Sequence, residues 1–267
     1  MVTALNRVKH LPRNDKGRDL IVGDLHGHPQ RLLEALSRLN FDPLADRVIS
    51  VGNLINKGPD SMGALKLLEA PWFHSVRGGC EALALAWLTK DPQWGENPLH
   101  FLLQGGNWIH RYPEPETRAY IQGLLEQTPL GLIVDHPVEP FRVVHAMWAP
   151  VLNEPGLIAP YRAHDVLWNS ALAQDAASIA QRAGVDFTRH SFFAKTPTWA
   201  DVTHSGRITY CGRNSTYGVR LMHHGHLHMN GGLGQPSNSP FAAARMLALA
   251  DHAVSLHLLS AAPALTL

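Results

Sequence analysis

Three short apolar runs each end in a loop of small and polar residues, and this repetition limits the chain to few folds. Residues 19–22 (DLIV) lead into GDLHGHP and then into a helical pattern at 30–41. Residues 47–51 (RVISV) and 72–76 (WFHSV) are likewise followed by loops and helical segments. Strands separated by helices in this way predict a parallel sheet with helices on both faces. In such sheets, ligands bind where strands end and helices begin.

The remaining segments predict a second layer. Residues from about 91 to 138 are mixed and Pro-rich, and we interpret them as a helical excursion, followed by a fourth strand at FRVVHA (141–146). From residue 191 onward, short β-like runs predict a second sheet of mainly antiparallel strands. We expect 1–17 to be a lead-in and 18–230 the main domain. Residues 231–267 would add a loop and a C-terminal β extension to that domain.

Composition narrows the class of protein. The 267 residues suit one large α/β domain, with 45% hydrophobic and 17% charged residues. A formal net charge of +1 gives no electrostatic reason to expect nucleic acid or a membrane as partner. No apolar run is long enough to span a bilayer, and the N-terminus lacks the apolar core of a secretory signal. Only Cys80 and Cys211 are present, so we expect no disulfide framework and a cytoplasmic location.

Polar side chains follow the ends of four predicted strands. They are Asp24, His26, Asn53, Lys57, Cys80 and His145. Because these strand ends meet at one edge of a sheet, we expect the side chains to converge there. Taken singly, each would more often be a capping or surface group, and Asp24 and His26 could simply cap the helix that begins near Pro29.

Five motifs that contain or flank these residues resemble, in the same order, the motifs of a known family. GDLHG, GNLINKG, RGGCE, VVHA and AKTP follow one another along the chain. They resemble the GDxHG, GDxVDRG, RGNHE, HA and GHTP motifs of calcineurin-like metallophosphoesterases, specifically the small phosphoprotein phosphatases of lambda-phage and bacterial type. Diadenosine tetraphosphate hydrolases belong to the same superfamily. The likeness covers about residues 18–222 and implies an α/β sandwich of two mixed sheets flanked by helices.

The resemblance also implies where two divalent metals would bind. It places the first metal on Asp24 and His26, which keep ligand chemistry. The bridging aspartate of the family falls on Asn53, which is neutral and cannot supply an anionic bridge between two cations. The ligands of the second metal fall on Gly79, His145 and Lys195. Only His145 is a ligand type, and an ammonium at residue 195 would repel a divalent ion.

The catalytic positions implied by the resemblance have changed as well. The catalytic histidine falls on Cys80, and the aspartate that orients it falls on Asn56. A neutral thiol is a poor replacement for an imidazolium that protonates a leaving oxygen. The two arginines that grip phosphate fall on Lys57, which keeps a charge without a bidentate fork, and on Ser170. The residues around the motifs thus still resemble the family, whereas most residues at its metal-binding and catalytic positions have changed.

We therefore predict a pseudophosphatase that binds an unidentified protein partner or a phosphorylated ligand. No cofactor is expected, or at most one weakly held Mn²⁺, Mg²⁺ or Zn²⁺ ion. One alternative is a slow metal-dependent phosphoesterase acting on phosphomonoesters or nucleotides. Another is an enzyme rebuilt around a reactive Cys80 thiolate. A zinc shell of Asp24, His26, His145 and Cys80 also stays open, as does a buried Cys80 thiol that only fills space.

The run MHHGHLHMN contains a second histidine cluster. Its GHxH also resembles a phosphoesterase motif, but it lies well beyond Lys195, the position that matches the family spacing. As a strand, the run would present His224, His226 and His228 on one face, and we expect that face to be exposed. If the alignment were shifted there, His226 or His228 would supply a metal ligand. Cys211 is predicted to be a core residue.

Overall fold

The apolar runs of the sequence form short strands that belong to two sheets. The computed structural model describes residues 7–90, 98–153, 166–167, 208–215, 221–223, 226–230, 233 and 249–253. The strands are β1 (Val8–Leu11), β2 (Asp19–Val22), β3 (Arg47–Ser50), β4 (Phe73–Ser75), β5 (Gly131–Val134), β6 (Phe141–Val144), β7 (Thr209–Ser215), β8 (Leu221–His223), β9 (His226–Asn230) and β10 (Leu249–Asp251).

The helices lie where the helical patterns predicted them in the first half of the chain. They are α1 (Pro29–Arg38), α2 (Ser61–Lys66), α3 (Gly79–Thr89), α4 (Pro98–Leu103) and α5 (Pro115–Glu126), with 3₁₀ turns η1 (Leu67–Glu69), η3 (Gly106–Arg111) and η4 (Pro150–Asn153). Pro29 occupies the first turn of α1, where its missing N–H costs no hydrogen bond. Asp60 caps α2 by accepting a hydrogen bond from the backbone N–H of Gly63.

Both sheets are mixed. The first has the order β10-β2-β3-β4, with β2, β3 and β4 parallel and β10 antiparallel to β2. The second has the order β1-β5-β6-β7-β9-β8, in which the pairs β1–β5, β6–β7 and β7–β9 are parallel. The expectation of a mainly antiparallel second sheet is therefore wrong for the strands that the structure describes.

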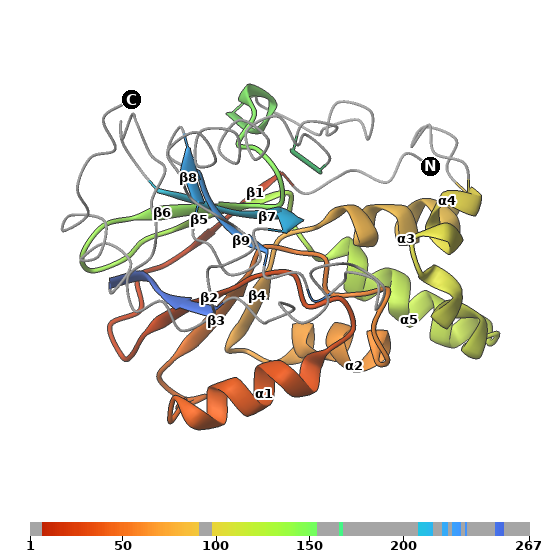
Figure 1. Cartoon of the computed structure of the whole chain (residues 1–267), viewed down its shortest axis with the longest axis horizontal. Helices are drawn as coiled ribbons and strands as arrows, with labels where there is room; N and C mark the ends of the chain where they lie inside the picture. Colours follow the sequence, from red (N-terminus) through yellow and green to blue (C-terminus); the bar gives the residue numbers. More distant parts are fainter. Residues whose placement is uncertain are drawn as a thin grey trace, which may run out of the picture.

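The two sheets pack face to face, and helices cover the outside. One core contains Ile21, Ile49, Leu132 and Val143, contributed by both sheets. A second core joins the opposite face of β2 and β3 to α1 and α3. Figure 1 shows the second sheet above the first, with α1 and α2 below. Helices thus cover one face of the first sheet and not both, because the second sheet occupies the other face.

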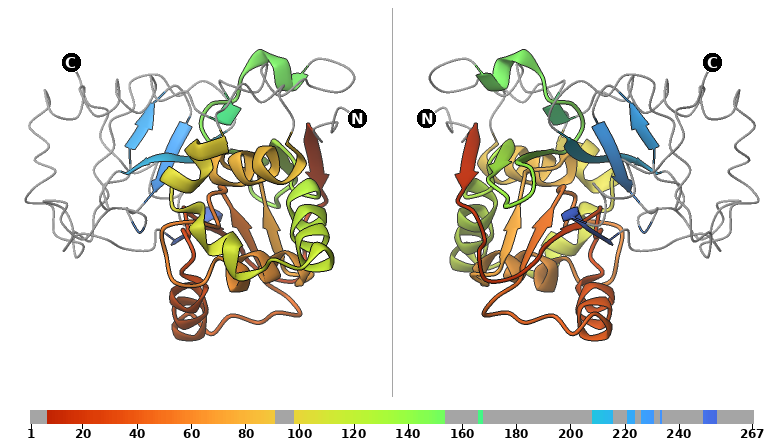
Figure 2. Two further views of the ribbon diagram at one scale, coloured as in Figure 1. Left: turned by 90° about the vertical axis from the view of Figure 1, so that its right-hand side faces the viewer. Right: turned by 90° about the vertical axis from the view of Figure 1, so that its left-hand side faces the viewer.

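Three strands lie outside the pattern predicted from sequence. β1 falls in the segment expected to be only a lead-in, and it pairs with β5. β5 (Gly131–Val134) falls inside the segment interpreted as a helical excursion, and it pairs with both β1 and β6. β10 comes from the C-terminal segment but joins the first sheet beside β2, not the second sheet. The side views show β1 and α5 along the same side of the molecule (Figure 2).

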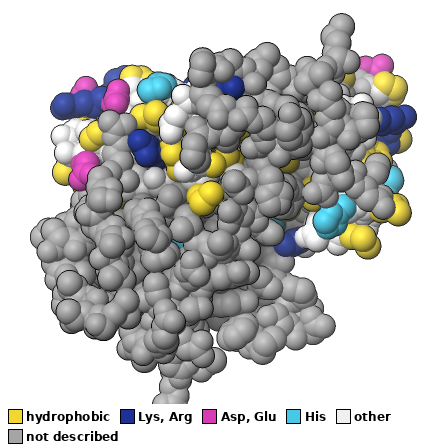
Figure 3. Space-filling model, turned by 90° about the horizontal axis from the view of Figure 1, so that it is seen from above, with side chains coloured by type: hydrophobic (Ala, Val, Ile, Leu, Met, Phe, Trp, Pro, Cys, Tyr) yellow, Lys and Arg dark blue, Asp and Glu magenta, His cyan; other side chains and the backbone are white. Residues whose placement is uncertain are grey.

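The surface of the described part carries mixed charge. Seen from above, Lys and Arg side chains stand near Asp and Glu side chains at both sides of the view (Figure 3). This mixture agrees with the net charge of +1. Within the described ranges, none of the helices has the length and apolar character needed to cross a bilayer.

Candidate functional site

The carboxyl ends of the first sheet bring three predicted site residues into direct contact. Asp24 follows β2, Asn53 follows β3, and Cys80 lies in the first turn of α3 after β4. The Nδ2 atom of Asn53 donates to Asp24 Oδ2 at 2.9 Å. The backbone N–H of Cys80 donates to Asn53 Oδ1 at 2.9 Å. Asn53 therefore joins the other two residues through its side-chain amide.

The loops of this site hold an unusual backbone shape. Positive φ angles occur at His26 (43°), Asn53 (51°), Asn56 (72°) and Lys57 (64°). Positive φ angles are uncommon for residues other than glycine. Strained backbone conformations of this kind cluster at functional sites. Backbone hydrogen bonds hold the loops together, since the N–H groups of Leu25 and His26 donate to the carbonyl of Asn53 at 3.1 and 2.8 Å. The loop geometry predicted from the motifs is thus present.

Glu81 fixes this geometry, although the sequence argument assigned it no role. Its carboxylate is fully buried and accepts backbone hydrogen bonds at 2.8 Å from Asn53, Leu54 and Gly78, and at 3.3 Å from Ile55. It is the third residue of α3, so the bond from Gly78 is half of a capping box. Glu81 is the last residue of the motif RGGCE, and that motif was the sequence signal from which its role could have been predicted.

Asp24 is buried beside two imidazoles. Its Oδ2 lies 3.5 Å from His26 Nε2, and His26 Nδ1 lies 3.3 Å from the carbonyl oxygen of Ile55. Burial acts to raise the pKa of Asp24, but the hydrogen bond with His26 and the nearby His145 outweigh it and lower that pKa. The carboxylate is therefore ionised at neutral pH. The alternative in which Asp24 and His26 cap α1 is wrong, because the N-cap is His28 and no side chain caps it.

His145 is fully buried and oriented by the backbone. Its Nδ1 lies 2.8 Å from the carbonyl oxygen of Val51. Because a carbonyl only accepts, Nδ1 is the donor, and the neutral ring has its lone pair at Nε2. Gly212 of β7 brings this histidine close to Asp24, since a Cβ on Gly212 would lie 2.2 Å from Asp24 Oδ1 and 3.3 Å from His145 Nδ1. Only glycine fits there, and sequence reasoning did not single it out.

Asn56 and Lys57 point in different directions from the same loop. Asn56 is buried, and its Oδ1 accepts a 2.8 Å hydrogen bond from Trp108 Nε1. Its Nδ2 has no hydrogen-bond partner among the described residues. Lys57 is exposed and packs its backbone against Gly105. The buried amide is thus held by an indole, a partner that the motifs did not reveal, while the lysine faces solvent.

The remaining predicted residues divide into buried and undescribed ones. Cys80 is buried in the apolar core beneath α3. Ser170, Lys195 and His224 lie outside the described residues, as does the side chain of His226. His228 is buried, and its Nδ1 lies 3.3 Å from the Sγ of Cys211 in the neighbouring strand. The expected exposed face is therefore wrong for His228, because its side chain lies beside Cys211, which belongs to a buried cluster that includes Ala82 and Ala86 of α3. Cys211 is confirmed as a core residue.

Comparison with known proteins identifies the fold. The family profile described as "Calcineurin-like phosphoesterase" matches residues 18–230. The chain belongs to the calcineurin-like phosphoesterase family. Among solved structures, the crystal structure of a candidate diadenosine tetraphosphatase superposes with a TM-score of 0.51 at 18% identity, over 92% of this chain and 98% of that one. This likeness concerns the fold alone.

Three bacterial phosphoesterases are similar in sequence to this chain. Serine/threonine-protein phosphatase 2 of Escherichia coli (strain K12) is 40% identical over 116 residues, 43% of this chain and 50% of that protein. Serine/threonine-protein phosphatase 1 of Salmonella typhimurium is 31% identical over 187 residues, 66% of this chain and 77% of that protein. The symmetrical bis(5'-nucleosyl)-tetraphosphatase of Glaesserella parasuis is 30% identical over 138 residues, 49% of this chain and 44% of that protein. The chain thus matches about half the length of the first of these relatives.

The donor set does not fit the two-metal centre of a calcineurin-like phosphoesterase. Asn53 presents an N–H, not a carboxylate oxygen, to Asp24, and Gly79 has no side chain. No group of three or more His, Cys, Asp or Glu side chains in the described part of the chain is arranged to hold a metal ion. The zinc shell of Asp24, His26, His145 and Cys80 therefore does not form among these residues. The side-chain amide of Asn53 is instead hydrogen-bonded at both ends, to Asp24 and to the backbone N–H of Cys80.

Proposed function

We propose that this phosphoesterase-family chain is a pseudophosphatase, which uses the retained fold to bind and does not hydrolyse phosphate esters. The observation that supports this most strongly is the side-chain amide of Asn53. It stands at the bridging position of the family and is hydrogen-bonded at both ends, to Asp24 and to the N–H of Cys80.

Hydrogen bonding fixes the orientation of this amide. If it were flipped, Oδ1 would face the Asp24 carboxylate and Nδ2 would face the N–H of Cys80. Both contacts would be repulsive, so the N–H must point at Asp24. A metal bound to Asp24 Oδ2 would have to displace that N–H, which would leave two buried polar groups to be satisfied again. The N–H of Asn53 therefore takes the place beside Asp24 that a metal ion would occupy if residue 53 were a bridging carboxylate.

The surroundings of Cys80 favour the same proposal. A general acid must lie within reach of the leaving oxygen and must have a suitable pKa. Such catalysis contributes about 10²- to 10⁴-fold to the rate. Cys80 is buried in an apolar core, where a thiol packs as a small hydrophobic group. This placement also weighs against an enzyme rebuilt around a Cys80 thiolate, since that chemistry needs an accessible sulfur.

Binding would use Lys57, an exposed cation in the same loop as Asn53 and Asn56. Lys57 directly follows the buried Asn56 and is itself exposed. An ammonium at that place attracts a phosphorylated ligand without the bidentate geometry that an arginine would impose. We expect Lys57→Glu to weaken binding of a phosphoserine peptide about tenfold or more. Lys66→Glu, on an exposed position of α2, is the matched control and should leave binding unchanged.

The test of the proposal is hydrolysis of a chromogenic phosphomonoester with Mn²⁺, Ni²⁺, Mg²⁺ or Zn²⁺ and with a chelator. Wild type is compared with Asp24→Asn, which removes the one carboxylate of the residual ligand set. The expected result is no metal-dependent rate above that of the variant. A rate that requires metal and disappears in Asp24→Asn would refute the pseudophosphatase.

One observation favours a second candidate, a slow metal-dependent phosphoesterase. The contact of His145 Nδ1 with the Val51 carbonyl is the arrangement typical of metal-bound histidines, in which the other ring nitrogen is the ligand. With the Asp24 carboxylate ionised, these two residues could share one ion. This candidate predicts that His145→Gln abolishes a metal-dependent rate, whereas the pseudophosphatase predicts no such rate to abolish.

A further inference from the structure

His252 joins three separate segments of the chain at one end of the sandwich. It directly follows β10 and is fully buried. Its Nε2 lies 2.8 Å from the carbonyl oxygen of Glu139, in the turn between β5 and β6. Its Nδ1 lies 2.9 Å from the hydroxyl of Tyr210 in β7. The imidazole thus links the edge strand of the first sheet to two elements of the second sheet.

These two contacts fix one neutral form of the ring. A carbonyl oxygen only accepts, so Nε2 carries the proton and donates to Glu139. Nδ1 is then the acceptor, and the hydroxyl of Tyr210 donates to it. Both ring nitrogens are satisfied in this state. A proton added at Nδ1 would face the hydroxyl proton, so the present bond would be lost and a charge would be buried.

Aromatic rings enclose the imidazole. The ring centroids of Phe141 and His136 lie 4.2 and 4.6 Å from that of His252. Burial lowers the pKa of His252 to about 4. The bond to the Glu139 carbonyl acts against this shift, and the nearby His136 adds to it. The docked ring is therefore neutral at pH 7.

The ionisable residues around this cluster come from each neighbouring element. Asp19 of β2 and Asp251 of β10 act to raise the pKa of His136, but burial outweighs them. Within the described ranges, no carboxylate forms an ion pair with His252 that would stabilise its charged form. The ionisable residues of this neighbourhood are Arg13, Asp19, Arg47, His136, Glu139, Tyr210 and Asp251.

Strand β10 has little else to hold it. It is three residues long, and among them only Ala250 is buried. It is the outer strand of the first sheet and pairs with β2. The carbonyls of Arg18 and Val22 in β2 accept from β3, so the backbone groups of Ile21 face Ala250 on the other side. The imidazole of His252 is therefore the main buried anchor of this strand.

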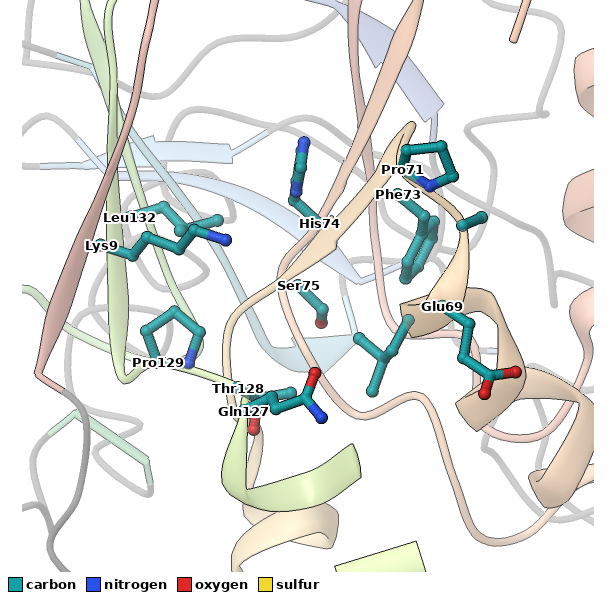
Figure 4. A pocket seen from close by; sticks show the side chains of 12 residues that line it. Lys9, Glu69, Pro71, Phe73, His74, Ser75, Gln127, Thr128, Pro129 and Leu132 are labelled. Atoms are coloured by element: carbon teal, nitrogen blue, oxygen red, sulfur yellow. The ribbon is translucent and has the colours of Figure 1, made fainter. Parts of the chain in front are cut away.

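A second buried histidine gives a contrast at the opposite edge of the first sheet. His74 of β4 also has a pKa lowered to about 4, mainly by burial. Its side chain lines a pocket together with Lys9 and Glu69 (Figure 4). In the described part of the chain, its ring is hydrogen-bonded to no other element. Protonation of His74 therefore breaks no link between strands, which makes this residue a matched control.

We propose that His252 is a proton-operated lock on the C-terminal strand: the neutral ring holds β10 against β2, and protonation releases it. A released ring regains its ordinary pKa of 6.5, so docking loses stability as pH falls from 6.5 towards 4. Release opens the outer edge of β2, the strand that leads to Asp24. The lock does not depend on whether the chain hydrolyses phosphate esters.

The test is amide hydrogen exchange of the full-length isotope-labelled chain, followed by nuclear magnetic resonance and corrected for intrinsic exchange rates. Two amides on opposite sides of β2 are compared. The N–H of Ile21 faces β10, whereas the N–H of Val51 donates to the carbonyl of Val22. We expect Ile21 to be the less protected amide. Its opening constant should rise roughly twentyfold between pH 7 and pH 5, because release moves the pKa of His252 from about 4 to 6.5.

Variants assign this pH dependence to one ring. His252→Gln keeps a donor for Glu139 and an acceptor for Tyr210 but takes up no proton, so the opening constant of Ile21 should change less than about threefold. His74→Gln should keep the wild-type pH dependence at Ile21. A twentyfold rise that persists in His252→Gln would overturn the proposal. Equal protection of Ile21 and Val51 at every pH would also overturn it, since β10 would then open only with the whole fold.

Discussion

Two buried carboxylates, Asp24 and Glu81, lie at the same edge of the first sheet and meet opposite surroundings. Glu81 accepts four backbone N–H bonds from the loops, whereas Asp24 faces imidazoles and the amide of Asn53. Burial raises the pKa of Glu81 despite those bonds, while His26 and His145 keep the pKa of Asp24 low. The shape of the loops thus rests on Glu81, and any ion chemistry rests on Asp24.

Replacing Glu81 is the strongest test of this division. Glu81→Gln would turn an NH₂ group towards backbone N–H donors that are fully buried, and would leave them unpaired. We expect the free energy of unfolding to fall by roughly 3 kcal/mol, measured by denaturant titration. Glu34→Gln, on the exposed side of α1, is the control and should stay within about 0.5 kcal/mol of wild type. A loss for Glu81→Gln no larger than the control would break the comparison.

A substitution at Gly212 tests how closely β7 of the second sheet packs against Asp24. A Cβ at this position would lie 2.2 Å from Asp24 Oδ1 and 2.8 Å from Val51 Cγ2. Gly212→Ala should therefore cost about 2 kcal/mol of stability. In the Asp24→Ala background the cost should fall by about half, because one of the two clashes is removed. Strictly additive costs in this double-mutant cycle would mean that β7 does not constrain the carboxylate.

The sequence predicted the architecture of two mixed sheets and the meeting of three polar residues at one sheet edge, but it missed particular strand pairings. Asp24, Asn53 and Cys80 were placed together because parallel strands deliver their carboxyl ends to one edge. The pairing of β10 with β2 was out of reach, since a three-residue strand has no periodicity and its partner is distant in the chain. Strand β5 (GLIV) is as long as the predicted β2, but it lies in the mixed, Pro-rich segment that was interpreted as helical, and it was missed for that reason.

Side-chain partners were also beyond sequence reasoning. The bond from Trp108 to Asn56 and the fourfold role of Glu81 depend on contacts between segments far apart in the chain. The motifs identified which residue types had changed, such as Asn at position 53. They gave no information on the direction in which the new amide would point, and that direction is the basis of the proposed function.

The pH dependence of stability should differ in sign between the two carboxylates. The lowered pKa of Asp24 contributes stability that is present above its ordinary value of 3.8 and is lost as pH falls through the folded pKa. The raised pKa of Glu81 contributes stability that is present below 4.5 and is lost as pH rises through its folded pKa. The stability difference between wild type and Asp24→Asn should thus shrink towards acid pH. The difference for Glu81→Gln should grow, and parallel profiles would contradict the assignment.

The most direct test of the central claim is the effect of Mn²⁺ on the melting temperature of wild type and of Asn53→Asp. The account predicts no shift for wild type, because the amide N–H already occupies Asp24. Asn53→Asp sets two carboxylates against each other, so it should melt lower than wild type without metal. With Mn²⁺ at about one hundred times its dissociation constant, the variant should recover by roughly 5 °C or more. A Mn²⁺-dependent rise in wild type that disappears in Asp24→Asn would show that the native residues hold a metal and would contradict the account.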